Sequence, residues 1–243
     1  MLDIQKLEKS FGEKRAVQGL SFTVEKGPVL GFLGPNGAGK STTMRMIAGV
    51  LEPDSGDATI DGKSIVSARR EAQAALGYLP EGAPLYDDMT PPEFLAFMAA
   101  ARSLPRSERK SAIERAIADS RISTVCGQRI GSLSKGYRRR VGLAGAILHD
   151  PPVLLLDEPT DGLDPNQKRA VRALIARMAP RKAIVISTHT LTEVPAMCTR
   201  AIVVDRGRIV ADETPEGLLK QSADGTLESA FTRLTDQAEA ESA

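Results

Sequence analysis

A glycine-rich segment carries the clearest chemical signal in the chain. It runs Gly34-Pro35-Asn36-Gly37-Ala38-Gly39-Lys40-Ser41-Thr42 and fits the phosphate-binding pattern G-x-x-x-x-G-K-[ST]. Glycines at these positions let backbone N–H groups turn inward around phosphates, and the start of a helix favours negative charge. We expect Lys40 to reach the β- and γ-phosphates of a nucleotide and the Ser41 hydroxyl to ligate Mg²⁺.

A second segment supplies acidic groups. The apolar run from Val153 to Leu156 ends in Asp157 and Glu158. Beside a phosphate loop, Asp157 would make the second Mg²⁺ contact by way of water, and Glu158 would orient or deprotonate the attacking water. Such a run is weak alone, because many strands stop at an acidic turn, but with the loop it predicts a P-loop nucleotidase. A small GTPase is disfavoured, since the guanine-reading sequence Asn-Lys-x-Asp does not occur.

The sequence around these two motifs predicts alternating strands and helices, which would hold the phosphate loop and the acidic pair in position. Short runs at 153–156, 183–187 and 201–204 lack polar alternation, as parallel strands buried on both faces do. Apolar runs at 28–33 and 76–79 add two more strands, and residues 40–50 and 166–178 have helical spacing. The alternating segments 2–7 and 20–25 predict antiparallel strands. We therefore expect an α/β P-loop NTPase core with a mainly parallel sheet and an N-terminal antiparallel β subdomain.

The chain divides into two parts of unequal size. We predict that residues 1–220 form the nucleotidase domain, and the pattern between about 87 and 147 changes to helix, which predicts an inserted α-helical subdomain. Residues 221–243 are acidic, and Leu227, Phe231 and Leu234 are spaced for one helical face. This last part is predicted to be an acidic C-terminal helix and tail.

The charge balance gives no support to a nucleic-acid-binding role. Lys plus Arg number 32 and Asp plus Glu 31, for a formal net charge of +1, whereas proteins that grip nucleic-acid backbones carry basic surfaces. The longest apolar stretches are far shorter than the ~18 to 20 residues that a membrane span requires. Cys126 and Cys198 have no metal-ligand spacing. We expect a soluble cytoplasmic protein without nucleic acid as a partner.

Between the phosphate loop and the end of the chain, further motifs carry a family resemblance. Leu133-Ser134-Lys135-Gly136-Tyr137 looks like the Leu-Ser-Gly-Gly-Gln signature of ABC proteins. Over about residues 2–220 the sequence resembles the ATP-binding subunit of an ABC transporter. In that family, Ser134 and Gly136 would begin a helix whose N-terminus binds the γ-phosphate held by the other protomer.

The remaining motifs follow in the order that this family shows. The segment from Asp157 to Asp164 matches its second Mg²⁺ motif running into the D-loop, to which Asp164 belongs. His189 follows a predicted strand where the switch histidine belongs, and the resemblance implies that it hydrogen-bonds the γ-phosphate and holds Glu158 in register. Phe11 lies where an aromatic side chain stacks on adenine.

Two positions depart from the family pattern. Lys135 replaces the first signature glycine and Tyr137 the usual glutamine, which adds positive charge near the nucleotide while Ser134 and Gly136 are kept. In the Q-loop, Glu81 stands where a glutamine usually senses Mg²⁺ and relays to the membrane partner. A glutamate can also ligate Mg²⁺ as a hard oxygen donor, but it brings charge.

The resemblance implies an ATP-binding and ATP-hydrolysing subunit that powers transport through a separate membrane permease. Two such chains, identical or different, would associate head to tail with ATP between them. The subunit would lie at the inner face of the cell membrane, held there by the permease. The stretch from Gly77 to Thr90 and the Lys-Gly-Tyr signature are similar to ABC-2-type exporters, in particular to gliding-motility-associated ATP-binding subunits. Export is thus the expected direction, and the cargo would be selected by the permease.

Two other functions fit the sequence less well. A soluble ABC ATPase acting on ribosomes usually carries two such domains, and those acting on DNA insert coiled coils or Cys-x-x-Cys zinc modules; one P-loop and neither insertion occur here. A pseudo-ATPase that binds ATP without hydrolysis is disfavoured because Lys40, Asp157, Glu158 and His189 are all present.

Several other features are given a structural interpretation. The run Arg138-Arg139-Arg140 is interpreted as a solvated or interface face of the helix after the signature, and His149 as a surface or capping group. Leu85, Tyr86 and Met89 are expected to be partly exposed, because the membrane partner docks near this position in the family.

Overall fold

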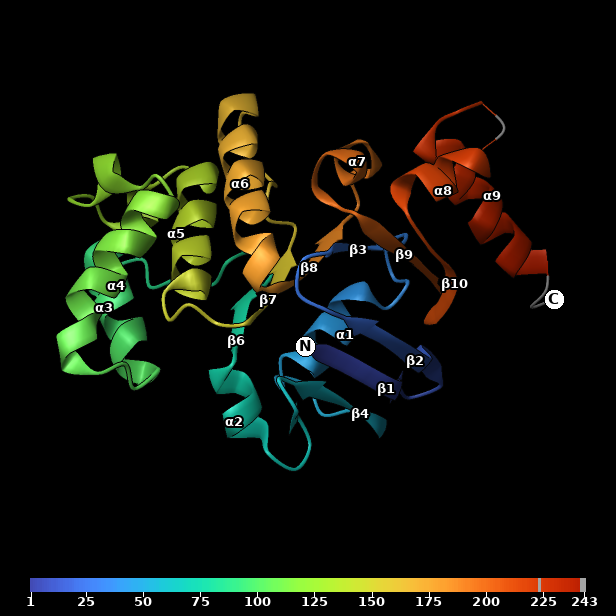
Figure 1. Ribbon diagram of the computed structural model, residues 1–243, viewed down its shortest axis with the longest axis horizontal. Coiled ribbons are helices and arrows are strands. Elements are labelled where there is room, and N and C mark those ends of the chain that lie inside the picture. Colours follow the sequence, from blue (N-terminus) through green and yellow to red (C-terminus); the bar gives the residue numbers. More distant parts are fainter. Residues whose placement is uncertain (223, 241–243) are drawn as a thin grey trace.

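Two β-sheets meet in the computed structural model of the chain, which describes residues 1–222 and 224–240 (Figure 1). The first sheet is antiparallel with the strand order β2-β1-β4-β5. Its strands are β1 (Leu2–Phe11), β2 (Lys14–Val24), β4 (Ser55–Ile60) and β5 (Lys63–Ser64). This sheet lies at the lower right in Figure 1 and corresponds to the predicted antiparallel β subdomain.

The second sheet has the order β10-β9-β3-β8-β7-β6, and all its neighbouring strands are parallel except the β10–β9 pair at one edge. Its strands are β3 (Val29–Leu33), β6 (Leu76–Leu79), β7 (Val153–Asp157), β8 (Ala183–Thr188), β9 (Arg200–Asp205) and β10 (Arg208–Glu213). Every residue of β3, β7 and β8 is buried, which explains why their sequences show no polar alternation. The predicted fold class is confirmed.

The register of the parallel strands brings the ends of the predicted motifs to one edge. Leu33 pairs with Thr188, and Asp157 pairs with Ser187. Leu79 pairs with Leu156, one residue before Asp157. The carboxyl ends of β3, β6, β7 and β8 therefore meet where the phosphate loop, the Q-loop, the acidic pair and His189 begin.

Helices cover both faces of the parallel sheet. Helix α1 (Lys40–Ile47) lies between the two sheets, and its residues Met44, Met46 and Ile47 are buried in the cluster that they share. The opposite face packs against α6 (Pro165–Met178), α7 (Val194–Met197), α8 (Pro215–Lys220) and α9 (Leu227–Ala240). Phe231 and Leu234 of α9 pack there too, as the spacing in the sequence predicts. The residues beyond 240 lie outside the described chain.

The remaining helices form a group with its own apolar cluster, drawn at the left in Figure 1. They are α3 (Pro91–Ala101), α4 (Arg106–Asp119) and α5 (Lys135–Ile147), and the short α2 (Arg69–Ala74) precedes β6. Thr90 is the N-cap of helix α3, and its backbone N–H donates to Glu93 at 2.8 Å as part of a capping box. No helix among the described residues combines the length and apolar composition that crossing a bilayer requires.

The first two strands are longer than the sequence pattern predicts. The alternation was expected to end at Leu7 and to begin again at Leu20, yet β1 continues to Phe11 and β2 begins at Lys14. The pairing register shifts between Ile4 and Leu7, and Lys6 between them has a φ of 48°. Because a bulge inserts a residue into one strand, the alternation loses its phase although the pairing goes on.

Candidate nucleotide-binding site

The phosphate loop joins β3 to α1, and the side chain of Lys40 folds back onto the loop backbone. Lys40 is only 8% exposed. Its Nζ atom donates hydrogen bonds to the carbonyl oxygens of Gly34 at 2.6 Å and Pro35 at 2.9 Å. These contacts hold the ammonium group inside the loop, at the N-terminus of α1, where a phosphate would be attracted by both the charge and the helix dipole.

Gly39 is a loop position that cannot carry a side chain. Its φ of 104° lies in the left-handed region, and an added Cβ would come within 2.4 Å of the Ala16 carbonyl oxygen. Its own carbonyl accepts a hydrogen bond from Thr43 Oγ1 at 2.9 Å. Only glycine can therefore turn the chain from the loop into α1 while lying this close to β2.

A cavity of about 240 Å³ lies beside this loop. It brings together residues that the sequence assigned to ATP binding and is lined by Phe11, Lys14, Ala16, Asn36, Gly37, Gly39, Lys40, Ser41 and Thr42. Phe11 at the end of β1 is 52% exposed, so a face of its ring is open to a stacking partner. The structure thus places an aromatic ring and the phosphate loop around one cavity.

Three carboxyl groups interact electrostatically with the ammonium group of Lys40. Burial lowers the pKa of Lys40, while Glu158, Asp157 and Glu81 oppose this shift. Burial raises the pKa of Asp157, and the neighbouring Glu81 adds to that rise. A divalent cation would relieve this negative charge, and the Ser41 hydroxyl and the carboxylates of Asp157 and Glu81 are oxygen donors of the kind that Mg²⁺ prefers. The described residues hold no cluster of three or more His, Cys, Asp or Glu side chains that could bind a metal ion by themselves, so the nucleotide phosphates would have to supply further ligands.

Glu158 and His189 form one hydrogen-bonded unit. Glu158 is 8% exposed. Its Oε1 atom accepts from the His189 backbone N–H at 2.8 Å and lies 2.7 Å from His189 Nδ1, while Oε2 accepts from Thr188 Oγ1 at 3.2 Å. The His189 ring itself is exposed. A carboxylate held in this way can orient a water molecule and accept its proton.

The signature segment begins α5 and contacts the D-loop, Thr160–Asp164. Ser134 is the N-cap of α5, and its Oγ accepts from the Tyr137 N–H at 3.4 Å. Lys135 Nζ forms an ion pair with Asp161 at 2.8 Å. A Cβ added to Gly136 would lie 3.1 Å from the Gly162 carbonyl oxygen, so the helix start is packed closely on this loop.

The predicted D-loop residue Asp164 has a structural partner of its own. Its carboxylate accepts hydrogen bonds at 2.9 Å from the backbone N–H groups of Asn166 and Gln167, which makes it the N-cap of α6. The same loop is tied to the segment after His189, because Thr160 Oγ1 donates to Glu193 and Lys168 Nζ approaches that carboxylate within 2.7 Å.

Comparison with known proteins decides which kind of nucleotide site this is. A family model described as "ABC transporter" matches residues 17–161, which is more than half of the chain. This chain belongs to the ABC transporter family. It is an ATP-binding subunit of that family and an ATPase, and the family predicted from the signature, the D-loop and the switch histidine is confirmed.

Two curated relatives are similar over most of the ABC subunit. Nod factor export ATP-binding protein I of Burkholderia lata is 36% identical over 223 residues, which cover 90% of this chain and 72% of that protein. The protein of the same name from Rhizobium sp. (strain N33) is 37% identical over 224 residues and is covered to 73%. These relatives do not test the resemblance to gliding-motility subunits, which stays a prediction.

Solved structures share the fold of this ABC subunit. One described as the ATP binding subunit of an ABC transporter superposes with a TM-score of 0.87 at 27% identity, covering 97% of this chain and 99% of that one. CbiO1 from Clostridium perfringens, part of an ABC transporter complex, gives a TM-score of 0.76 at 27% identity, with 90% of each chain covered. A dimeric cassette bound to ADP and Pi, 21% identical, has the same fold.

The arginine run after the ABC signature lies differently from the prediction. Arg138 is half-buried and pairs with Asp87 at 2.7 Å. Arg139 and Arg140 are only 5% and 6% exposed, so the interpretation of the run as a solvated or interface face was wrong for both. They lie on the side of α5 that also buries Leu143 and Ala144, and backbone carbonyls accept their hydrogen bonds. The helical period of those apolar residues was the available signal.

His149 and Glu193 were also misplaced or missed. His149 was interpreted as a surface or capping group, but it is half-buried, 3.0 Å from Arg102 Nη1 and 3.1 Å from the carbonyl of Leu76 in β6. Burial and the charge of Arg102 lower the pKa of His149 to about 4.

Glu193 is a buried carboxylate whose partners come from distant segments, and no sequence pattern pointed to it. Tyr86 is exposed and Leu85 and Met89 are half-buried, as predicted.

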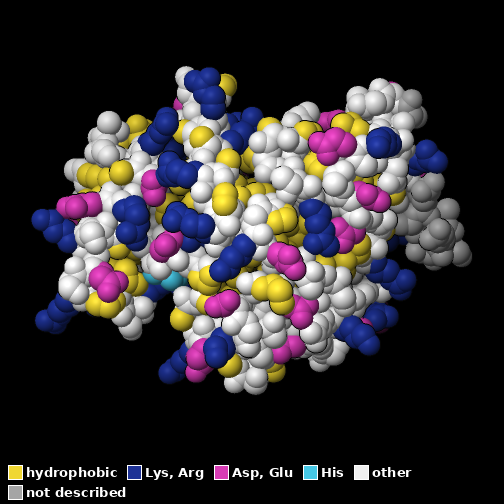
Figure 2. Space-filling model, viewed as in Figure 1, with side chains coloured by type: hydrophobic (Ala, Val, Ile, Leu, Met, Phe, Trp, Pro, Cys, Tyr) yellow, Lys and Arg dark blue, Asp and Glu magenta, His cyan; other side chains and the backbone are white. Residues whose placement is uncertain are grey.

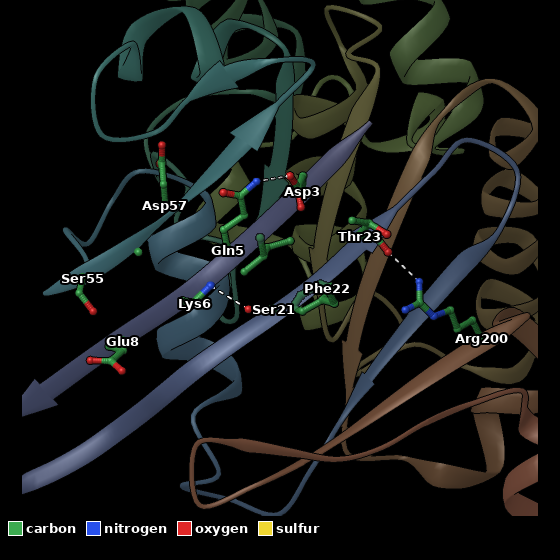
Figure 3. Close-up of a pocket in the computed structure, with 12 residues that line it drawn as sticks. Asp3, Gln5, Lys6, Glu8, Ser21, Phe22, Thr23, Ser55, Asp57 and Arg200 are labelled. Carbon is green, nitrogen blue, oxygen red and sulfur yellow. Dashed lines mark hydrogen bonds between the residues drawn. The ribbon is translucent and has the colours of Figure 1, made fainter.

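The outer face of the antiparallel sheet carries a wider depression of about 960 Å³ (Figure 3). Its polar side chains bond mainly to neighbours in the same sheet: Ser21 Oγ accepts from the Lys6 N–H at 2.8 Å, and Gln5 donates to Asp3 at 2.7 Å. Arg200 reaches it from β9 and donates to the Thr23 carbonyl at 2.6 Å. No residue that we assign to the nucleotide site lines this depression.

Proposed function

We propose that this chain is the ATP-hydrolysing subunit of an exporter and that residues 1–220 form its ATPase unit. The observation that carries the proposal is the buried Glu158 carboxylate, which is hydrogen-bonded to His189 and lies within the electrostatic field of Lys40. Export as the direction is supported by the relatives named for Nod factor export. The cargo would be selected by the separate permease.

The residues of the site divide the work of phosphoryl transfer. The loop from Gly34 to Thr42 and Lys40 bind the phosphates, and Phe11 stacks on the base. Ser41, Asp157 and Glu81 would hold Mg²⁺, which supplies positive charge to the leaving phosphate oxygens. Glu158 would accept the proton of the attacking water, and His189 holds that carboxylate through Nδ1. The His189 ring is exposed, so it could hydrogen-bond the γ-phosphate of a bound ATP.

A second protomer would complete the site. Ser134 and Lys135 are exposed at the start of α5, where the helix dipole and the lysine favour an anion. We propose that this end, with Gly136 and Tyr137, faces the ATP held by the other protomer of a head-to-tail dimer, and that Asp164 lies in the D-loop at the same interface. Hydrolysis then weakens the interface and resets the transporter.

The permease would dock beside the Q-loop. A groove of about 390 Å³ is lined there by apolar residues that include Pro84, Leu85, Tyr86, Phe94 and Met98. Tyr86 and Phe97 are exposed and their ring centres lie 5.2 Å apart. An apolar groove next to Glu81 fits a short helix of a membrane partner, which would hold this subunit at the inner face of the membrane. Basic and acidic side chains are interspersed on the face in Figure 2, so that face carries no continuous basic patch for nucleic acid.

Affinity purification of the Glu158→Gln variant tests this function. The variant is purified from native membranes in detergent with ATP and Mg²⁺, which should hold the closed dimer on its partner, and the co-purified proteins are identified by mass spectrometry. Lys40→Ala, which should not close on ATP, is the control. Recovery of a multi-span permease with Glu158→Gln supports the transporter function. Recovery of ribosomal or DNA-repair proteins without a membrane protein would overturn it.

A further inference from the structure

Arg139 is hydrogen-bonded to the segment that follows β6 and to the segment that follows β7. It lies in α5, its Nε donates to the Glu158 carbonyl oxygen at 2.9 Å, and its Nη1 donates to the Pro80 carbonyl oxygen at 2.8 Å. Pro80 follows β6 directly and precedes Glu81 of the Q-loop. The rigid guanidinium plane therefore sets the distance between the Q-loop backbone and the backbone of Glu158.

The backbone of Glu158 needs such support. Its φ of 51° lies in the left-handed region, which residues with a side chain disfavour. Its N–H donates to the Ser187 carbonyl at 2.9 Å, while its carbonyl is held by Arg139. The backbone of the turn at Glu158 is thus held by two hydrogen bonds, one to Ser187 in β8 and one to Arg139 in α5.

The charge of Arg139 is placed among the acidic groups of the site. Burial lowers the pKa of Arg139, and Asp157, Asp161, Glu158 and Glu81 counteract this shift. Its Nη2 atom is buried and has no hydrogen-bond partner within the described part of the chain. A buried guanidinium with one unpaired donor lowers stability, and this is a cost of the kind that residues of functional sites carry.

We propose that Arg139 is a positioning residue that holds the general base Glu158 in register with the Q-loop. A displacement of the Q-loop by the permease then moves the Glu158 backbone through the shared guanidinium. This inference rests on the proposed function, because it takes Glu158 as the base that activates water.

Substitution of Arg139 by glutamine tests the proposal, with Arg102→Gln as the matched control. Arg102 is also a partly buried arginine, and its Nη1 donates to the carbonyls of Gln73 at 3.0 Å and Leu76 at 2.9 Å, at the end of β6 opposite to the Q-loop. For Arg139→Gln we expect kcat for ATP hydrolysis to fall by ~10- to 10²-fold, the scale of a small displacement of a catalytic group. KM for ATP should stay within about twofold, because the phosphate loop is untouched.

The control separates positioning from loss of stability. Arg102→Gln should lower the melting temperature as Arg139→Gln does but leave kcat unchanged. A fall in kcat for Arg139→Gln that Arg102→Gln matches at equal loss of melting temperature would overturn the inference, and so would a rise in KM at unchanged kcat. If Arg139→Gln does not fold, Arg139→Lys takes its place: lysine lacks the planar fork, so a reduced kcat supports the role and a full kcat contradicts it.

A variant pair distinguishes this inference from the proposed function. In a Glu158→Gln background, Arg139→Gln should cause no further loss of kcat, because the group that it positions is already gone. Full turnover by Glu158→Gln alone would reject the proposed role of Glu158. Loss of turnover by Glu158→Gln with full turnover by Arg139→Gln would reject only the positioning role.

Discussion

His189 contacts a single oxygen of Glu158 twice, through its backbone N–H at 2.8 Å and through Nδ1 at 2.7 Å. The carboxylate is therefore held both by the end of β8 and by a side chain that follows it. Because Thr188 Oγ1 donates to the second oxygen, both Glu158 oxygens have partners within the protein. The proposed general base is thus held in one orientation by the protein itself, as electrostatic catalysis requires.

Replacement of Glu158 by glutamine should abolish most turnover. Glutamine keeps the shape and can accept the bond from the His189 N–H, but it cannot accept a proton from water. We expect kcat to fall by about 10²-fold or more while ATP still binds. Phosphate release and the binding of a fluorescent ATP analogue are measured on the same preparation. Unchanged hydrolysis would show that another group activates the water.

Replacement of Lys40 by methionine should separate stability from nucleotide binding. Methionine fills a similar volume but leaves the carbonyls of Gly34 and Pro35 without the ammonium donor, so the melting temperature without nucleotide should fall moderately while the chain still folds. Saturating ATP should raise the melting temperature of the natural chain, since a ligand that binds only the folded state stabilises it. For Lys40→Met this rise should be lost. An equal rise in both proteins would mean that Lys40 does not contact the phosphates.

The ion pair between Lys135 and Asp161 should contribute little to the free energy of unfolding. Both side chains are largely exposed, and exposed pairs are worth about 0 to 1 kcal/mol. We expect Lys135→Gly, which restores the family residue, to change unfolding in urea by less than about 1 kcal/mol. Any loss should shrink in high salt, because salt screens exposed charges. A salt-independent loss of several kcal/mol would instead indicate that Lys135 packs structurally on Gly162.

The depressed pKa of His149 predicts a pH-dependent stability. Burial lowers it from 6.5 to about 4, so between these values the unfolded chain binds a proton that the folded chain does not. Stability should therefore be complete above about pH 6.5 and fall as the pH is lowered toward 4. The slope of the unfolding free energy against pH over this range should be smaller in His149→Gln. Identical slopes in the two proteins would show that a group other than His149 causes the pH dependence.

The sequence predicted the elements that carry apolar periodicity and the loops that follow them. Short apolar runs such as Val153 to Leu156 are typical of strands buried on both faces, and the glycine spacing of the phosphate loop is specific to phosphate binding. Arg139 could not be placed in this way. Its charge suggested solvent, while its partners are backbone carbonyls 19 and 59 positions away, and a carbonyl carries no residue-type signal. The length of β1 was underestimated for a related reason. The bulge at Lys6 shifts the pairing register, and no residue type in the sequence marks such a shift.

The two carbonyl bonds of Lys40 also determine how the loop discriminates among anions. An ammonium group has three N–H donors, and two of those of Lys40 are bound to the carbonyls of Gly34 and Pro35, so one donor is left for a phosphate oxygen. A lone phosphate would gain that one bond from the lysine, whereas a polyphosphate chain would also contact the N–H groups along the loop and the start of α1. We therefore expect the loop to bind a nucleoside triphosphate more tightly than inorganic phosphate.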